Sequence, residues 1–437
     1  MLRGTQQNLI DPDSNLKAIL EFICGEANKL TNCGIYYARQ LLFKTHKYVS
    51  KFDLNNECKR NKHFQAMHSQ AAQQTLQSVA ESFKSYKALT AAYQAGKLLN
   101  KPRLPNYRKP GLVTVSYPKQ ALKLVDGIVR VPLGTLVNTW FKLKYFEIPF
   151  PGNFPEDSWD YIKELRILPR NGCFYTEWVY QAASEKVELD PNNALGIDHG
   201  VANWLTCVSS MGTSFIIDGL HLKSINRWYN KQVSTLKDGK PQGFWNKKLA
   251  QITEKRNRQM RDAVNKAARL VINHCIENNI GTIVFGWNKG HKDGAEMGRK
   301  NNQKFVQIPT ARLKDRIQQL CEVVGIRFIE TEESYTSKAS FLDNDELPTF
   351  GAKLEGWQPT GKRTERGLYR TARNHYVNAD CNGAANIIRK VSTTSDLDLS
   401  RVCRGTLTCP TRVRFWSLVT AKQKLRLGLK TQGVASV

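Results

Sequence analysis

The sequence lacks any long apolar run. No window comes near the roughly 20 consecutive apolar residues that a membrane-spanning helix needs. The opening residues, MLRGTQQNLIDPDSNL, have neither the charged start nor the apolar stretch of a secretory signal. We therefore expect a folded cytoplasmic protein with no membrane partner.

Paired cysteines are also absent. The chain has 10 cysteines, none in a CxxC pair, and the closest two are Cys403 and Cys409. Structural zinc usually takes its ligands in closely spaced pairs, so we expect no zinc site. The pattern is typical of reduced, mostly buried thiols.

Acidic residues are few relative to basic ones. Asp and Glu number 38 against 65 Lys and Arg, which gives a formal net charge of +27. A polyanionic partner follows, and nucleic acid is the obvious one, because each phosphate contact releases condensed counterions. Charge alone leaves open a ribosome-associated or merely basic protein.

The first part of the chain is expected to be mainly helical. A short strand at residues 2–9 precedes amphipathic helices over about 14–100, and the proline-rich, basic segment 101–111 follows as an extended linker. Candidate nucleic-acid contacts in this part are polar or basic side chains expected at the surface: Gln70, Gln74, Arg103 and Arg108.

The remainder predicts two kinds of β structure and a tail. Short β-rich runs over 112–187 suggest a small barrel interrupted by the helices, and strands alternate with amphipathic helices over 193–390. The expected fold class is therefore α+β and multidomain. The expected domains are a β-barrel with its helical insertion over 1–190, a mixed α/β domain over 191–390 and a basic, loosely ordered tail over 391–437.

Asp198 stands at the end of an apolar strand. The run ALGIDHG leads into this acid, turns at Gly200 and returns as a second strand. An Asp in such a hairpin often does no more than stabilise the turn. Asp198 becomes a candidate site residue only together with the other acids of the domain. The helix over 246–279 adds a cationic face that includes Arg258 and Arg261.

Glu333 follows a second strand end. The strand GTIVFGW at 281–287, a helix over about 310–324 and the strand over 326–333 form a strand, helix, strand unit, which implies parallel neighbours. Because carboxyl ends of parallel strands lie on one rim of a sheet, Glu333 is expected near acids carried by other strands.

Asp380 lies at the start of the helix in VNADCNGAANIIRK. Its side chain either caps this helix or points into a site. In both cases the helix dipole favours the ionised form. Asp198, Glu333 and Asp380 gathered together would repel one another without a cation, and oxygen ligands with open water positions suit magnesium, two ions of which can hydrolyse a phosphodiester.

The motifs GIDHG, ETEESYTSKASFLDND and NADCNGAANIIRK together resemble the nuclease half of the TnpB family, RNA-guided nucleases of bacterial insertion sequences. The resemblance covers about 190–390 and implies a ribonuclease H-like (RuvC) fold, with the first half serving as a β-barrel wedge and helical recognition lobe. It also implies a guide RNA, a double-stranded DNA target beside a short flanking motif, Mg²⁺ with Mn²⁺ as a substitute, nucleoid association on DNA, and no small-molecule substrate.

Two departures from the family pattern matter. Most members carry the middle glutamate where this chain has Gly286, whereas some, including the eukaryotic Fanzor relatives, carry it just before the TSK motif. By that resemblance the third catalytic and metal-binding acid is Glu333, with Glu332 and Glu330 in reserve. If none of these binds metal, the protein is a nuclease-dead, RNA-guided DNA-binding repressor.

The second departure is the missing zinc finger after TSK. The target-binding insert, about 338–376, must hold itself together by other means. Its basic candidates for nucleic-acid contact are Lys338, Arg363, Arg366 and Arg370. Its candidate core residues are Leu342, Leu347, Phe350, Leu354, Trp357, Leu368 and Tyr369.

A compact type V CRISPR effector shares this fold and chemistry, and sequence barely separates it from the transposon form. The small size of the chain favours the transposon form. A guide-free transposase or junction resolvase is disfavoured, because such enzymes need no large half to hold a guide duplex.

Overall fold

The computed structural model describes residues 2–152, 154, 156–182, 186–288, 308–352 and 355–414. The chain divides into two units, with the division between Ala183 and Ser184. The division lies a few residues before the boundary at 190 that the sequence suggested. Among the described helices, none is long and apolar enough to cross a membrane.

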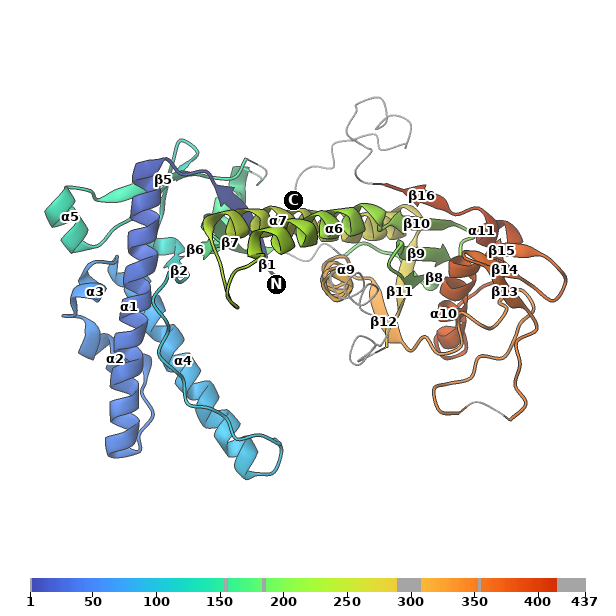
Figure 1. The fold of residues 1–437 in the computed structure, drawn as a ribbon, viewed down its shortest axis with the longest axis horizontal. Coiled ribbons are helices and arrows are strands. Elements are labelled where there is room, and N and C mark those ends of the chain that lie inside the picture. Colours follow the sequence, from blue (N-terminus) through green and yellow to red (C-terminus); the bar gives the residue numbers. More distant parts are fainter. Residues whose placement is uncertain are drawn as a thin grey trace. The chain divides into compact units, whose positions relative to one another are not determined.

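The first unit begins with a strand that pairs far along the chain. Strand β1 (Leu2–Ile10) lies antiparallel to β7 (Cys173–Ala182), and the sheet continues through β6 (Ile162–Arg170) to β2 (Val115–Pro118). Helices α1 to α4 lie between β1 and β2 in the chain. This helical segment is therefore an insertion into the sheet, as predicted (Figure 1).

The inserted helices are α1 (Ser14–Thr45), α2 (Lys51–Cys58), α3 (Lys62–Gln65) and α4 (Ser69–Gln94). Helix α1 starts where Asp13 accepts a hydrogen bond from the Leu16 amide at 2.7 Å, which satisfies one of the free N–H groups of the first turn. The linker 101–111 contains no helix or strand, and Asn32 of α1 binds both backbone groups of Arg108.

A second sheet completes the β structure of this unit. It has the order β3 (Lys123–Val125), β4 (Ile128–Pro132), β5 (Tyr145–Pro149), all antiparallel, with α5 (Thr135–Phe141) between the last two. Two 3₁₀ turns, η1 (Lys119–Ala121) and η2 (Glu156–Tyr161), connect the strands.

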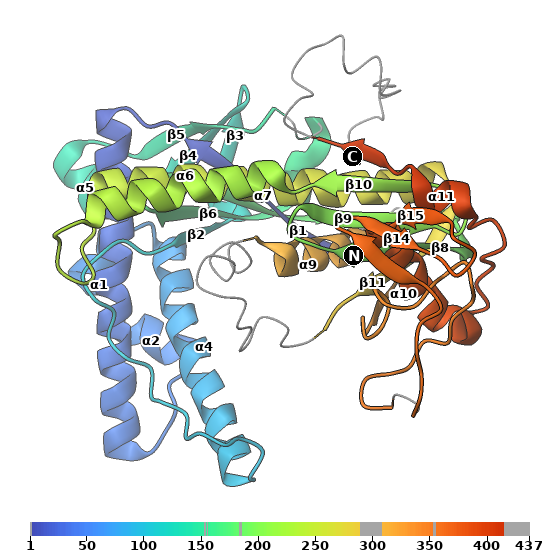
Figure 2. The same ribbon diagram turned by 45° about the vertical axis from the view of Figure 1, so that its right-hand side comes forward.

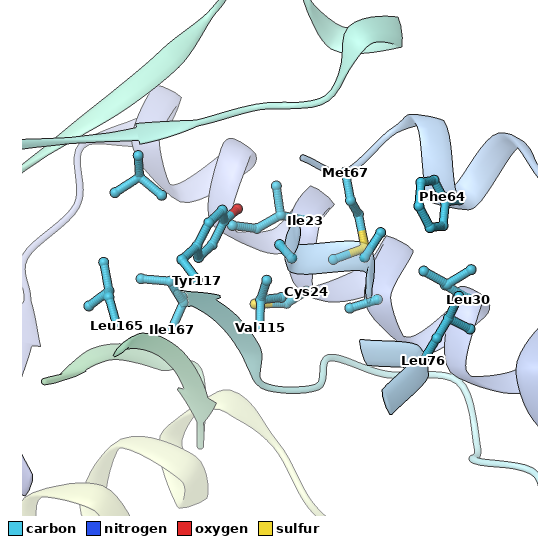
Figure 3. Close-up of a cluster of buried hydrophobic side chains, with 14 of the residues drawn as sticks. Ile23, Cys24, Leu30, Phe64, Met67, Leu76, Val115, Tyr117, Leu165 and Ile167 are labelled. Atoms are coloured by element: carbon cyan, nitrogen blue, oxygen red, sulfur yellow. The ribbon is translucent and has the colours of Figure 1, made fainter. Parts of the chain in front are cut away.

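One apolar core joins the helices and strands of the first unit. Ile23 and Cys24 of α1 lie beside Val115 and Tyr117 of β2, as the close-up shows (Figure 3). All four side chains are almost fully buried, and burial of this kind is the main favourable term in folding. The lobe and the sheet of this unit therefore fold on a shared core.

The second unit is built on a mixed sheet. Its strand order is β12-β11-β8-β9-β10-β16; all six strands are labelled in Figure 1, and β8 to β11 also in Figure 2. Strands β8, β11 and β12 are parallel, β9 is antiparallel to both of its neighbours, and β16 lies parallel to β10. The bounds are β8 Asp190–His199, β9 Asn203–Ser209, β10 Ser214–Asp218, β11 Ile280–Gly286, β12 Arg327–Thr331 and β16 Thr411–Val413.

Helices cover both faces of this sheet. On one face, helices α7 and α9 share a core with Leu195, Ile197 and Phe285. On the other face, Ile387 and Ile388 of α10 pack with Ala194 and Val284. The helices are α6 (Leu220–Lys237), α7 (Lys247–Glu277), α9 (Thr310–Val324), α10 (Ala379–Ser395) and α11 (Arg404–Thr408). A small antiparallel sheet precedes α10: β13 (Lys362–Glu365), β14 (Leu368–Arg370) and β15 (Tyr376–Asn378).

The expected loose tail from 391 is wrong for residues up to 414. Helix α10 continues to Ser395, α11 buries Leu407, and β16 adds an edge strand to the main sheet. The polar composition hides this order because the stabilising contacts come from strand pairing with β10, which leaves no periodic apolar pattern. Residues 415–437, with the basic end of the tail, lie outside the described residues.

Hydrogen bonds to Asp345 tie the insert together. Asp345 Oδ2 accepts from the backbone N–H groups of Ser340 at 2.7 Å and Thr360 at 3.0 Å, and Oδ1 accepts from the Thr360 hydroxyl at 2.6 Å. Tyr369 is fully buried, but the candidate core residue Phe350 is 85% exposed, since it lies in the loop between these anchored segments. Leu354 lies outside the described residues. The insert is held mainly by polar contacts around a small core.

Candidate active site

Alternation along β8 aims Asp198 toward α10. Ala194 packs with the apolar side chains of α10, and a Cβ atom on Gly196 would lie 2.4 Å from the Ala384 carbonyl oxygen. Residues two apart in a strand share a face, so Asp198 projects to the same side. A Cβ atom on Gly383 would come within 3.1 Å of Asp198 Oδ2, which shows how closely the helix approaches this acid.

Asp380 is not the cap of α10. The N-cap is Asn378, whose side chain accepts from the amides of Asp380 and Cys381. The Asp380 carboxylate instead accepts from Asn203 Nδ2 at 2.7 Å on Oδ2 and from Arg363 Nη2 at 3.1 Å on Oδ1. The Asp380 side chain therefore does not cap the helix and is directed toward Asn203 and Arg363.

Glu333 reaches the same rim from the segment after β12. A Cβ atom on Gly286 would lie 2.8 Å from Glu333 Oε1 and 2.9 Å from Glu333 Cγ, so the glutamate fills the space beside that glycine. Its backbone is fixed, because the Glu333 amide donates to Asn288 Oδ1 at 3.0 Å and its carbonyl accepts from Thr336. Glu333 thus stands directly beside Gly286 at the end of β11.

The two reserve glutamates have other partners. Glu330 forms an ion pair with Lys314 of α9, and Glu332 forms one with Lys390 of α10. Burial, the largest single effect, raises the pKa of Glu332, but the hydrogen bonds from Lys390 and Ser334 and the charge of Lys390 together outweigh burial and lower the pKa overall. These two acids are neutralised locally.

The clustered acids perturb one another. Desolvation raises the pKa of Asp198 well above its usual value, the charges of Glu333 and Asp380 raise it further, and Arg363 opposes them. Desolvation, with a smaller contribution from Glu332, raises the pKa of Glu333 to about 7. A buried acid such as Asp198, whose pKa is raised by two neighbouring carboxylates, favours a bound cation.

The donors at this site suit a divalent cation such as magnesium, which prefers carboxylate oxygens. Glu333 Oε1 is buried without a hydrogen-bond partner and lies 3.5 Å from His199 Nε2. Both Asp380 oxygens are engaged, and in the described part of the chain no three Asp, Glu, His or Cys side chains are arranged to hold one ion. The residues fit a metal by the chemistry of their donors, because each Asp380 oxygen keeps a lone pair beside the hydrogen bond that it accepts.

The candidate nucleic-acid contacts of the first unit lie in two places. Gln70 and Gln74 are half-buried on α4, and Gln70 Oε1 is buried without a hydrogen-bond partner. Arg103 and Arg108 are exposed on the linker. The linker arginines are therefore accessible to phosphate.

The candidates of the second unit are less uniform. Arg261 donates to the buried Glu254 at 3.0 Å and Arg363 binds Asp380, so both guanidinium groups are already paired with acids. The other candidates are exposed or half-buried: Arg258, Lys338, Arg366 and Arg370.

Sequence reasoning missed two residues beside these acids, Asn203 and Arg412. Asn203 holds Asp380, and Arg412 Nη2 donates to Asn203 Oδ1 at 2.9 Å. An Asn after a hairpin and an Arg near the end of a basic chain carry no local signal of such a role. Only the pairing of β9, β10 and β16 brings them to the acids.

A family model described as a probable transposase, OrfB_IS605, matches residues 178–291, a range that contains Asp198. The comparison with curated proteins finds no match. Among solved structures, the chain is similar to the Cas12f1–sgRNA–target DNA complex, with a TM-score of 0.58 and 15% identity over 86% of this chain and 83% of that chain.

The chain is also similar to a mini-RNA-guided endonuclease, CRISPR-Cas_phi3, with a TM-score of 0.43 and 11% identity over 89% of this chain and 92% of that chain. At 15% identity, the likeness to the Cas12f1 complex is evidence for the fold alone. The predicted fold class, an α+β chain of more than one domain, is confirmed.

Proposed function

We propose that this TnpB-like chain is an RNA-guided, metal-dependent DNA endonuclease associated with a transposon, which cuts DNA beside a short flanking motif. The observation that carries the proposal is the meeting of Asp198, Glu333 and Asp380 on one rim of the main sheet, where burial and mutual repulsion raise the pKa of Asp198. Buried carboxylates this close together are stabilised by a bound cation, and a cation held by carboxylates can promote the hydrolysis of a phosphodiester.

The partners in this proposal are a guide RNA and a double-stranded DNA. The net charge of +27 supports a polyanionic ligand. The similar Cas12f1 structure is a complex with a guide RNA and target DNA. Sequence specificity then comes from base pairing, while the protein holds the backbone. Such a protein acts in the cytoplasm, at the nucleoid when bound to DNA.

The residues of this chain divide the chemical work. Asp198, Glu333 and Asp380 hold the metal, and Asn203 orients Asp380 through Oδ2. When bound, Mg²⁺ or Mn²⁺ supplies Lewis acidity at the scissile phosphate and its attacking water. Arg363 donates to Asp380 Oδ1 at 3.1 Å and would give up this oxygen to a cation bound there. The exposed position of Arg363 leaves it beside the incoming backbone.

We assign the remaining parts by their position. The first unit, with Gln70, Gln74, Arg103 and Arg108, serves as wedge and helical recognition lobe. Arg258 and Arg261 of α7 are proposed as backbone contacts of the second unit. The insert 338–376 binds the target through Lys338, Arg363, Arg366 and Arg370.

The test is to purify the protein with its copurifying RNA, sequence that RNA, and offer a DNA library that carries the matching target beside random flanking bases. We expect cutting of one target with a selected flanking motif, only with Mg²⁺ or Mn²⁺. An RNA from a repeat array would favour the CRISPR effector. Specific cutting by protein freed of all RNA would exclude the proposal, and guided binding without cutting would identify a repressor.

A further inference from the structure

A chain of hydrogen bonds leads from the last described strand to the site. Arg412 of β16 donates through Nη2 to Asn203 Oδ1 at 2.9 Å, and Asn203 Nδ2 donates to Asp380 Oδ2 at 2.7 Å. Through Nη1, Arg412 also donates to Asp218 Oδ2 at 3.0 Å. The three elements involved, β16, β9 and the start of α10, are distant in sequence.

The chemistry of these groups permits only one orientation of the Asn203 amide. A guanidinium can only donate hydrogen bonds, and an ionised carboxylate can only accept them. With Arg412 on one side and Asp380 on the other, the amide oxygen must face Arg412 and the NH₂ group must face Asp380. Without Arg412, the amide is free to rotate and to present its oxygen to the carboxylate, where the two would repel.

Arg412 is itself held in place by the sheet. It pairs with Ile216 in the parallel ladder between β16 and β10. Its partner Asp218 is 4% exposed, stands opposite Asn203 in the register of β10 with β9, and accepts from the Leu220 amide at 2.7 Å. The guanidinium therefore bridges two side chains that the sheet already places together.

We infer that Arg412 is a positioning residue for the active site, which fixes the Asp380 carboxylate for metal binding through Asn203. The inference rests on the proposed function. Groups that orient a metal-binding side chain in this way typically contribute about 10- to 100-fold to metal affinity or activity. The segment 411–414 is thereby part of the nuclease and not an appendage.

The experiment measures Mn²⁺ binding to the full-length protein by electron paramagnetic resonance, counting only the binding that Asp198→Ala abolishes. The variants are Arg412→Gln, Asn203→Ala, the double variant, and Arg414→Gln as matched control, because Arg414 approaches the same Asp218 at 3.8 Å. Thermal unfolding and DNA cutting at graded Mn²⁺ concentrations accompany each measurement.

We expect Arg412→Gln to weaken Mn²⁺ binding about 10-fold or more, and to shift the Mn²⁺ concentration for half-maximal cutting equally. The double variant should match Asn203→Ala alone, because two residues acting in series are not additive. Arg414→Gln should bind as the unmodified protein does.

Three results would overturn the inference. Unchanged Mn²⁺ binding in Arg412→Gln, in a protein that cuts and loses cutting in Asp198→Ala, would reject the relay and keep the proposed function. An equal loss in Arg414→Gln, or a drop in unfolding temperature without a shift in Mn²⁺ binding, would assign Arg412 to the neutralisation of Asp218. Absence of Asp198-dependent Mn²⁺ binding in the unmodified protein would reject the relay together with the proposed function.

Discussion

The carboxylate of Glu333 fills the space in which a side chain at Gly286 would begin. The two residues belong to different segments, one at the end of β11 and the other just beyond β12, which lie side by side as parallel strands. An acid can therefore reach this rim from either strand, provided that the other strand leaves room. The missing side chain at 286 and the glutamate at 333 are two parts of one arrangement.

Gly286→Ala should impair the site although it removes no functional group. The added Cβ would come 2.8 Å from Glu333 Oε1 and 2.6 Å from Ile387 Cδ1, so one of the two must move. We expect cutting to fall about 10-fold or more, as for other disturbed metal ligands, with guided DNA binding retained. Gly152→Ala, which meets open space, is the control. The exchange Gly286→Glu with Glu333→Gly should regain part of the cutting, and failure of Gly286→Ala to change the rate would contradict the argument.

Glu333→Gln should remove cutting, whereas Glu332→Gln and Glu330→Gln should retain most of it. The amide keeps the size of Glu333 but supplies no charge to the metal. The other two acids are paired with Lys390 and Lys314, away from Asp198. Cleavage rates at saturating guide complex test this ranking. If Glu332→Gln were inactive and Glu333→Gln active, the metal ligand would be Glu332 and not Glu333.

Asp198→Ala and Asp380→Ala should each abolish cutting and leave RNA-guided target binding nearly unchanged. Both side chains lie at the rim of the sheet and hold metal in the proposal, while base pairing carries target recognition. Gel-shift and cleavage assays on the same preparations separate the two properties. Joint loss of binding and cutting would make these residues structural.

Asp345→Ala should destabilise the second unit. Asp345 accepts three hydrogen bonds that tie the insert together, and losing them costs about 2 kcal/mol or more. The control is Glu346→Ala, because Glu346 is the exposed neighbour of Asp345.

Zinc chelation should leave both cutting and thermal stability unchanged at fixed Mg²⁺. Inactivation by a zinc-selective chelator would show that the insert depends on a metal after all.

Glu26 should make the helical lobe sensitive to acid. Glu26 is 8% exposed, and its carboxylate is bound by Lys29 and His63, each at 2.6 Å. Burial raises the pKa of Glu26, but the hydrogen bonds from Lys29 and His63 outweigh burial and lower it overall. A folded-state pKa below the unfolded value gives stability that is present above about pH 4.5 and is lost as the pH falls through the folded-state pKa.

Glu26→Gln should therefore destabilise the lobe by about 2 kcal/mol at neutral pH and flatten this acid dependence. The control is Glu21→Gln on the same helix, because Glu21 forms only an exposed pair with Lys17 at 3.7 Å and should change stability little. Denaturant unfolding between pH 3 and 7, followed by a probe in the lobe, measures both. Parallel pH curves for the unmodified protein and Glu26→Gln would remove Glu26 as the cause.

Local pattern was enough to predict much of the second unit. The apolar period of the segment 310–324 predicted α9 with its bounds, and the strand, helix, strand order predicted that β11 and β12 are parallel. The helix and the parallel pairing can both be predicted from the sequence, because helix periodicity and the strand, helix, strand connection depend on residues close together in the chain. The placement of Asp198 at the end of a strand came from the same kind of signal.

Tertiary structure decided what depends on approach between distant segments. The sequence alone determined that three acidic motifs and a surplus of positive charge belong to one chain. Only the packing of α10 against the sheet decided that Asn378 caps the helix and that Asp380 turns toward Asn203. Only strand pairing at the sheet edge brought Arg412 to Asn203. Side-chain periodicity reports which face of an element is buried, but the partner on that face is set by register and packing, which no local pattern encodes.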